Sequence, residues 1–134
     1  MGVYVCGTGC GASELVGRGF SREDITAFVE SNPDAAAFLG RPVLKPGFFP
    51  DSLGGLEETF CFVSLDVDYE AATLAGLRYF WPRLSSGGYL MLHDWGNPAL
   101  PGPGKALGRY EEETGEPLAA VPIPDLNGTL VLCK

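Results

Sequence analysis

The sequence predicts an α/β domain with a mostly parallel sheet, and three segments near its middle carry this prediction. Residues 60–68 and 89–94 are apolar runs of strand length that end in acidic or imidazole side chains. Between them, residues 70–84 place apolar side chains at helical spacing, namely Leu74, Leu77, Trp81 and Leu84. Continuous apolar runs are typical of buried parallel strands, and parallel neighbours need a crossover connection. The three segments therefore predict a right-handed βαβ unit.

The N-terminal residues predict a strand followed by a glycine-rich turn. Residues 2–6 are mostly apolar, and Gly7, Gly9 and Gly11 follow at every second position. Glycines after a strand let the backbone approach a nucleotide-like ligand closely, so these three are candidate cofactor-binding residues. A flexible glycine-rich stretch is an equally good interpretation, because no acidic residue ends the strand and no long helix obviously follows.

The next segments predict short elements that fill the core. Ser21 is a candidate N-cap for a helix whose apolar stripe reaches Val29. A helical turn at 34–39 and a brief strand at 43–45 are expected to follow. Residues 46–52 then form a loop rich in proline and phenylalanine, which could cover the core or wall a ligand pocket.

After the βαβ unit, the chain predicts a helix and a hairpin. A proline in the first turn and a glycine after the end mark a helix at 103–114. Two strands at 118–122 and 129–133 flank a turn at 125–128. An antiparallel hairpin at the edge of an otherwise parallel sheet is a common close to doubly wound folds.

Composition and charge limit the classes of function. The 134 residues suit one domain over 1–134, and a composition of 46% hydrophobic and 19% charged residues is that of a globular protein. A net charge of −8 argues against a nucleic-acid partner, since there is no basic stripe for a phosphate backbone. No apolar run is long enough to span a bilayer, and the N-terminus lacks the pattern of a secretory leader. We therefore expect a cytoplasmic protein without a membrane partner.

The four cysteines do not form a recognisable metal or disulfide pattern. Cys6 and Cys10 have no second short-spaced pair, as a zinc site would require. Cys61 and Cys133 lie inside apolar runs and are expected to be buried small hydrophobic residues. Disulfides are not expected in a reducing compartment.

Four polar side chains at the ends of the two central strands form the main candidate site. Asp66 and Asp68 are two residues apart, whereas His93 and Asp94 end the second strand, and a loop at 97–104 is expected to lie over them. Open α/β sheets bind ligands beyond the carboxyl ends of their strands, and carboxylates suit a hard divalent cation. Two alternatives stay open: the aspartates could cap the next helix, and the histidine could be a buried, hydrogen-bonded imidazole.

Over residues 43–134 the sequence is similar to the macrocin O-methyltransferase family. The matching motifs occur in order along this part of the chain, at residues 45–52, 62–68, 73–77, 79–84, 87–89, 93–95, 101–107 and 128–134. The resemblance implies a Rossmann-like fold of the class I S-adenosylmethionine-dependent methyltransferases, with a magnesium ion at the site. It also implies methylation of a hydroxyl on a sugar or another natural product.

The resemblance implies a role for each residue at the matching positions. Asp66, the first acid of Leu-Asp-x-Asp, corresponds to a metal ligand, and Asp68 corresponds to the general base that takes the proton of the acceptor hydroxyl. Asp94 corresponds to a second metal ligand. His93 replaces a carboxylate of the family, so it could ligate the metal or act in catalysis as a hydrogen-bond partner.

The N-terminal side departs from the family, because the half that holds the cofactor is shortened and Val5 stands where an acidic residue is usual. We expect an S-adenosylmethionine-dependent, divalent-metal-assisted O-methyltransferase with a small-molecule hydroxyl acceptor. The alternative is a methyltransferase-derived domain that has lost cofactor binding and serves as a binding module, or uses its metal site for other small-molecule chemistry. An open sheet edge further predicts a homodimer, with or without exchanged elements.

Overall fold

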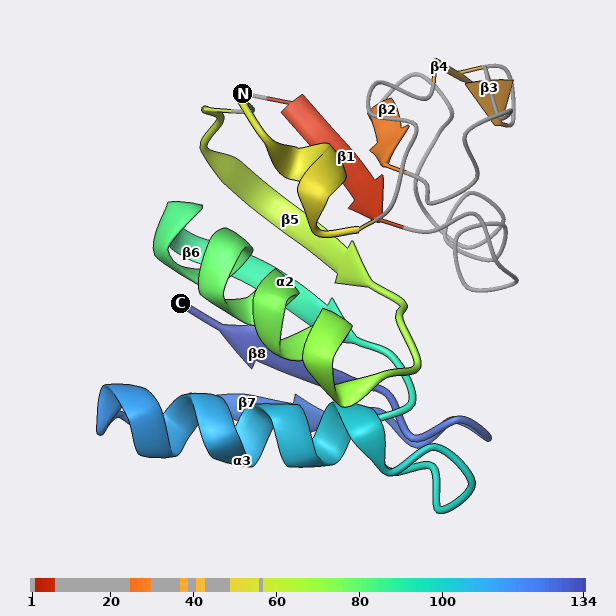
Figure 1. Ribbon diagram of the computed structural model, residues 1–134, viewed down its shortest axis with the longest axis vertical. Coiled ribbons are helices and arrows are strands. Elements are labelled where there is room, and N and C mark those ends of the chain that lie inside the picture. Colours follow the sequence, from red (N-terminus) through yellow and green to blue (C-terminus); the bar gives the residue numbers. More distant parts are fainter. Residues whose placement is uncertain (1, 7–24, 30–36, 39–40, 43–48, 56) are drawn as a thin grey trace.

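A six-stranded, mostly parallel sheet forms the centre of the protein (Figure 1). The computed structural model describes residues 2–6, 25–29, 37–38, 41–42, 49–55 and 57–134. The strands occur in the order β2-β1-β5-β6-β8-β7. Their bounds are Gly2–Cys6 for β1, Ile25–Val29 for β2, Phe60–Leu65 for β5, Leu84–Leu92 for β6, Ala120–Pro122 for β7 and Leu130–Cys133 for β8.

The strand directions agree with the predicted fold class. β2, β1, β5 and β6 run parallel to one another, β8 is antiparallel to β6, and β7 is antiparallel to β8. The parallel sheet with an antiparallel C-terminal hairpin is therefore confirmed.

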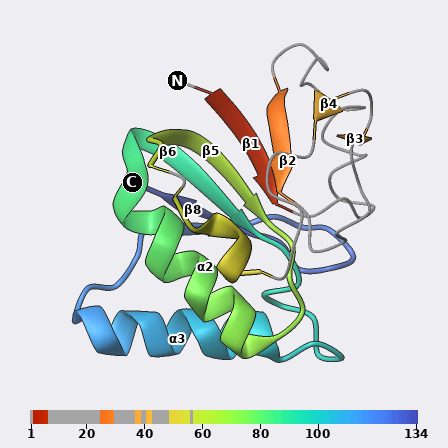
Figure 2. The same ribbon diagram turned by 45° about the horizontal axis from the view of Figure 1, so that its top comes forward.

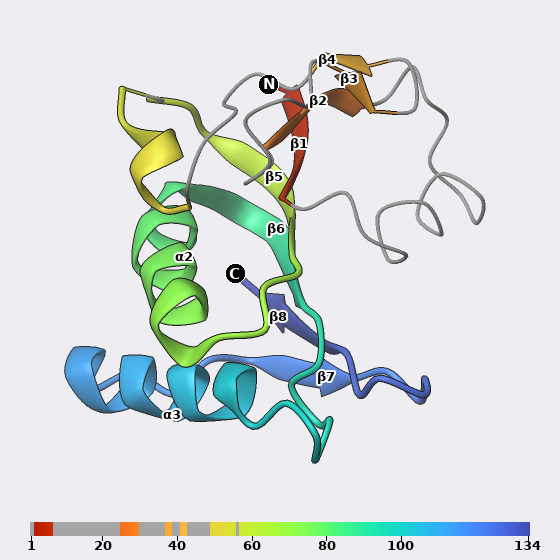
Figure 3. The ribbon, with the colours of Figure 1, turned by 45° about the vertical axis from the view of Figure 1, so that its right-hand side comes forward.

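Two helices cover one face of the sheet (Figures 2 and 3). α2 spans Glu70–Arg83 and connects β5 to β6, and α3 spans Gly102–Thr114 and packs against α2. Gly76 lets α2 approach the sheet closely, because a Cβ atom there would lie 2.8 Å from Leu65 Cδ1. The predicted βαβ unit is confirmed, and so are the predicted helices at 70–84 and 103–114 to within one residue at each end.

The core lies between the sheet and these helices. Side chains at alternate strand positions point toward the helices and are buried, namely Val63, Leu65, Leu90, Leu92, Leu130 and Leu132. From α2, Leu77 and Phe80 are fully buried, and Phe80 meets Phe60 edge to face with ring centroids 5.2 Å apart. Such packing fixes the ends of β5 and β6 relative to each other.

The described end of the proline- and phenylalanine-rich loop covers the core. Residues Asp51–Leu53 form a 3₁₀ turn, η1, and Leu53 is buried. Phe49 packs against the core, with its ring 6.5 Å from that of Phe80. The first three residues of this loop, 46–48, lie outside the described part of the chain. The strand predicted at 43–45 lies outside it as well.

Two helical predictions near the N-terminus are wrong. Residues Ile25–Val29, expected on a helix that begins at Ser21, form β2 and pair with β1. Ala37–Phe38, expected in a helical turn, form β3 and pair with Arg41–Pro42, which is β4, in a separate two-stranded sheet. In a segment this short, apolar side chains at i, i+3 and i+4 are compatible with both a helix and a strand. Pairing with a neighbouring strand then determines which structure forms.

The second central strand begins earlier than predicted. Residues 85–88, which lie between the predicted helix and the predicted strand, belong to β6, which starts at Leu84. Backbone bonds hold them to the C-terminus, because Gly87 N–H donates to Lys134 O and Lys134 N–H donates to Gly88 O. These glycines and serines, which end the helix, therefore lie in a strand that acquires a partner only in the folded protein.

The remaining predictions concern the cysteines, the N-terminal glycines and membrane-spanning helices. Cys61 and Cys133 are free thiols in strands as expected, although both are half-buried rather than buried. Gly7, Gly9 and Gly11 lie outside the described residues. Among the described residues, none of the helices combines the length and apolar character needed to cross a bilayer.

Candidate active site

The candidate site lies where β5 and β6 end side by side. His93 N–H donates to Leu65 O at 3.0 Å, so the pairing of the two strands extends to His93 after β6 and to the residue before Asp66 on β5. After β5 the chain turns toward α2, and Thr73 Oγ1 donates to Val67 O at 3.0 Å across that turn. These bonds hold Asp66 and His93 at neighbouring strand ends.

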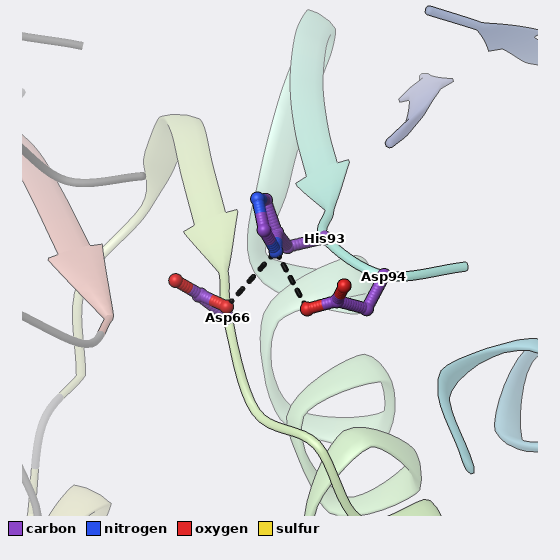
Figure 4. Close-up of side chains that lie close together, drawn as sticks. All are labelled: Asp66, His93 and Asp94. Carbon is purple, nitrogen blue, oxygen red and sulfur yellow. Dashed lines mark hydrogen bonds and ion pairs between the residues drawn. The ribbon is translucent and has the colours of Figure 1, made fainter. Parts of the chain in front are cut away.

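Three of the four predicted side chains form one cluster (Figure 4). The imidazole Nδ1 of His93 lies 2.7 Å from Asp94 Oδ2 and 3.2 Å from Asp66 Oδ1. Asp94 is almost fully buried, whereas the side chains of Asp66 and His93 are 19% and 20% exposed. The cluster is therefore partly open to solvent.

The backbone at Asp94 explains how two consecutive side chains can meet. In an extended strand, successive side chains point to opposite faces of the sheet. β6 ends at Leu92, and Asp94 has a φ of 56°, the left-handed region that few residues other than glycine and asparagine or aspartate adopt. This turn brings the Asp94 carboxylate back against the His93 ring.

The two carboxylates control the charge of the imidazole. The hydrogen bond to Asp66 raises the pKa of His93, burial opposes the rise, and the contact with Asp94 adds to it, so that the pKa moves from 6.5 to about 9. The imidazole is therefore positively charged at neutral pH in this arrangement. It neutralises part of the negative charge that two adjacent carboxylates bring to the edge of the sheet.

The same three residues fit a divalent cation. One ligand atom from each of Asp66, His93 and Asp94 can be chosen so that all lie within 4.8 Å of one another. Carboxylate oxygens are the ligands that Mg²⁺ prefers, and an imidazole nitrogen can complete the set once it has lost its proton. The cluster can therefore hold either a proton on His93 or an ion between the three side chains.

Asp68 lies outside this cluster. It is exposed, two residues beyond Asp66 on the connection to α2, and it is not one of the three residues whose ligand atoms converge. Its backbone packs tightly under the start of α3, since a Cβ atom on Gly102 would lie 2.5 Å from Asp68 O. An exposed carboxylate of this kind suits proton transfer better than ion binding.

Two asparagines that the sequence did not single out touch the cluster. Asn97 Nδ2 donates to Asp94 Oδ1 at 2.8 Å, and Asn127 Nδ2 lies 3.4 Å from His93 Nε2. Asn127 comes from the β7–β8 connection, which Gly96 N–H holds by donating to Gly128 O at 2.9 Å. The only sequence signal for Asn97 was its place in the loop predicted over the site, where Asn-Pro is typical of a turn.

Comparisons with known proteins give a fold but no sequence family. No protein-family model matches the chain, and no curated protein matches its sequence at a significant level. Among solved structures, the O-methyltransferase from Bacillus cereus in complex with SAH superposes with a TM-score of 0.68 at 18% identity, covering 99% of this chain and 74% of its own. CalS11, a TDP-rhamnose 3'-O-methyltransferase of calicheamicin biosynthesis, gives 0.65 at 15% identity, covering 98% and 70%.

The O-methyltransferase NovP superposes with a TM-score of 0.60 at 23% identity over 71% of this chain. The chain has the fold of these O-methyltransferases. It spans only 38% of the length of NovP. The class I methyltransferase fold that the resemblance implied is thus confirmed, whereas membership of the macrocin family stays a prediction.

Proposed function

We propose that this protein is an S-adenosylmethionine-dependent, divalent-metal-assisted O-methyltransferase that acts on a hydroxyl of a small, sugar-like molecule. The observation that carries the proposal is the cluster of Asp66, His93 and Asp94 at the carboxyl edge of a methyltransferase fold. Ligand sites of open α/β sheets lie at this edge. Fold alone does not define an activity, so the chemistry of these side chains supports the proposal.

The structural neighbours support the cofactor and the acceptor class. The Bacillus cereus enzyme was solved with SAH, which is S-adenosylmethionine without its reactive methyl group, and CalS11 acts on a TDP-rhamnose. We therefore assign S-adenosylmethionine as the methyl donor and a sugar-like hydroxyl as the acceptor. Gly7, Gly9 and Gly11 remain the proposed cofactor-binding residues.

Each polar residue of the site then has a role. When bound, S-adenosylmethionine supplies an electrophilic methyl group, and a divalent ion supplies positive charge that lowers the pKa of the acceptor hydroxyl. Asp66, His93 and Asp94 would hold the ion, and the paired strand ends fix the positions of these side chains. Asp68, exposed on the connection that follows Asp66, would accept the proton of the acceptor hydroxyl.

Calorimetric titration of the protein with S-adenosylmethionine, with and without Mg²⁺, tests the cofactor assignment. Micromolar binding is the expected result. A panel of sugar hydroxyl acceptors is then screened for SAH formation and for the mass of the methylated product. Absence of S-adenosylmethionine binding would contradict the proposal and favour the alternative, a methyltransferase-derived domain that has lost the cofactor.

The variant Asp68→Asn tests the general base. Removing the proton acceptor is expected to lower turnover by about 10²–10⁴-fold, because general bases contribute accelerations of this size. The metal affinity should stay close to that of the wild type, since Asp68 is not among the clustered ligand atoms. Equal turnover in wild type and variant would remove Asp68 from this role.

A further inference from the structure

Asn97 makes a bond pattern that fixes the orientation of its side-chain amide. Its Oδ1 accepts from Ala99 N–H at 3.0 Å, so the opposite end of the amide must carry the NH₂ group. This NH₂ group donates to Asp94 Oδ1 at 2.8 Å. The backbone agrees, because Asn97 N–H donates to Asp94 O at 3.2 Å and closes a turn between the two residues.

Asp94 uses its two oxygens for two different partners. Oδ1 accepts from Asn97, and Oδ2 lies 2.7 Å from His93 Nδ1. An aspartate side chain can rotate about two bonds, so a single contact does not define where its free oxygen points. With Oδ1 held by the amide, Oδ2 is directed at the space between His93 and Asp66.

We propose that Asn97 is a positioning residue of the site, which orients Asp94 so that its Oδ2 faces the proposed divalent ion. This inference rests on the proposed metal site. The residues that hold a metal ligand in place through a hydrogen bond typically control metal affinity by about 10–100-fold. Asn97 does so from the loop after β6, without contributing a ligand atom itself.

Asn97→Ser separates this role from a structural role in the loop. A serine hydroxyl can still accept from Ala99 N–H, as serines do in turns, but it is too short to reach Asp94. We expect the Kd for Mn²⁺, measured by the loss of its free paramagnetic signal, to rise by about 10–100-fold. Asn97→Ala removes both bonds, and its Kd should rise equally while its Tm falls further.

Asn127→Ser is the matched control, because it makes the same exchange beside the same cluster. Asn127 lies 3.4 Å from His93 Nε2 and comes from the opposite connection. Its Kd for Mn²⁺ should rise clearly less than that of Asn97→Ser, because the 3.4 Å contact with His93 is long and exposed and the Asp94 carboxylate keeps its donor. An unchanged Kd in Asn97→Ser would overturn the inference, and so would an equal rise in both serine variants.

A second measurement keeps the inference testable if the wild type binds no metal ion. His93 is the only histidine, so nitrogen-15 labelling of histidine gives ring signals from this residue alone. In the wild type, the Nδ1 proton should appear far downfield and exchange slowly, because it is bonded to an oriented Asp94. Asn97→Ser should move this signal upfield and speed its exchange, whereas Asn127→Ser should leave it in place.

The two measurements separate the inference from the function on which it rests. Failure of the wild type to bind Mn²⁺ contradicts the metal-assisted function, while the Nδ1 signal still reports whether Asn97 orients Asp94. If that signal is the same in Asn97→Ser and in the wild type, then Asn97 does not position the carboxylate, whatever the metal affinity.

Discussion

Metal binding should depend steeply on pH, because the ion and a proton compete for His93. The pKa of His93 is raised from 6.5 to about 9, chiefly by its hydrogen bond to Asp66 and further by Asp94, against the opposing effect of burial. At pH 7, about one imidazole in a hundred is then neutral, and at pH 8 about one in ten. Only a neutral imidazole nitrogen can bind a metal ion. The apparent affinity should therefore rise about tenfold per pH unit up to pH 9 and level off above it.

Calorimetric titration with Mg²⁺ or Mn²⁺ between about pH 7 and pH 8.5 measures this slope. Repeating it in two buffers of different ionisation enthalpy gives the number of protons released, which should approach one per ion near pH 7. His93→Asn is the control, since it lacks the titrating group and should show a flat profile. A flat wild-type profile without proton release would show that His93 does not ligate the ion and serves only as a hydrogen-bond partner.

The same pKa predicts how the ion-free protein responds to pH. A group whose pKa is higher in the folded state contributes stability that is fully present below the unfolded value, here about 6.5, and is lost as the pH rises through the folded value, here about 9. The difference corresponds to about 3 kcal/mol. Urea unfolding of wild type and His93→Asn across this range should show the loss in the wild type alone.

Three further predictions address the site, the fold and the assembly. Asp66→Asn should abolish any rise in Tm caused by Mg²⁺, and an unchanged shift would remove Asp66 from the metal site. Gly102→Ala should destabilise by about 1–3 kcal/mol in urea unfolding, because its Cβ would lie 2.5 Å from Asp68 O, whereas Gly108→Ala, with open space around it, should stabilise α3 by about 0.5–1 kcal/mol. Equal effects would refute the close contact. Light scattering after size exclusion should show the predicted homodimer, and a stable monomer would disprove it.

Some elements could be predicted because their signals are local. α2 repeats apolar residues over many turns, and α3 has a proline at its start and a glycine after its end. The strand Phe60–Leu65 is a continuous apolar run, typical of a buried parallel strand. In contrast, Ile25–Val29 is too short for its periodicity to decide, and its pairing with β1 made it a strand.

The candidate site divides in the same way. The positions of Asp66 and His93 follow from the sequence, because parallel strands present their carboxyl ends at one edge and the polar residues come directly after each apolar run. Asp68 was grouped with them on the same reasoning, but the structure leaves it exposed and outside the cluster. Past the last ladder bond, alternation along a strand no longer fixes the direction of a side chain.

The sequence by itself determined the βαβ unit and the polar strand ends beside it, since both depend on the order of apolar and polar residues along the chain. Only the tertiary structure decided how these groups meet. The left-handed backbone at Asp94, with a φ of 56°, turns its carboxylate onto His93, and Asn97 holds it there at 2.8 Å. The charge on His93 then follows from two carboxylates within 3.2 Å. Backbone angles and distances of this kind arise from the packing of separate segments, so the order of residues alone does not reveal them.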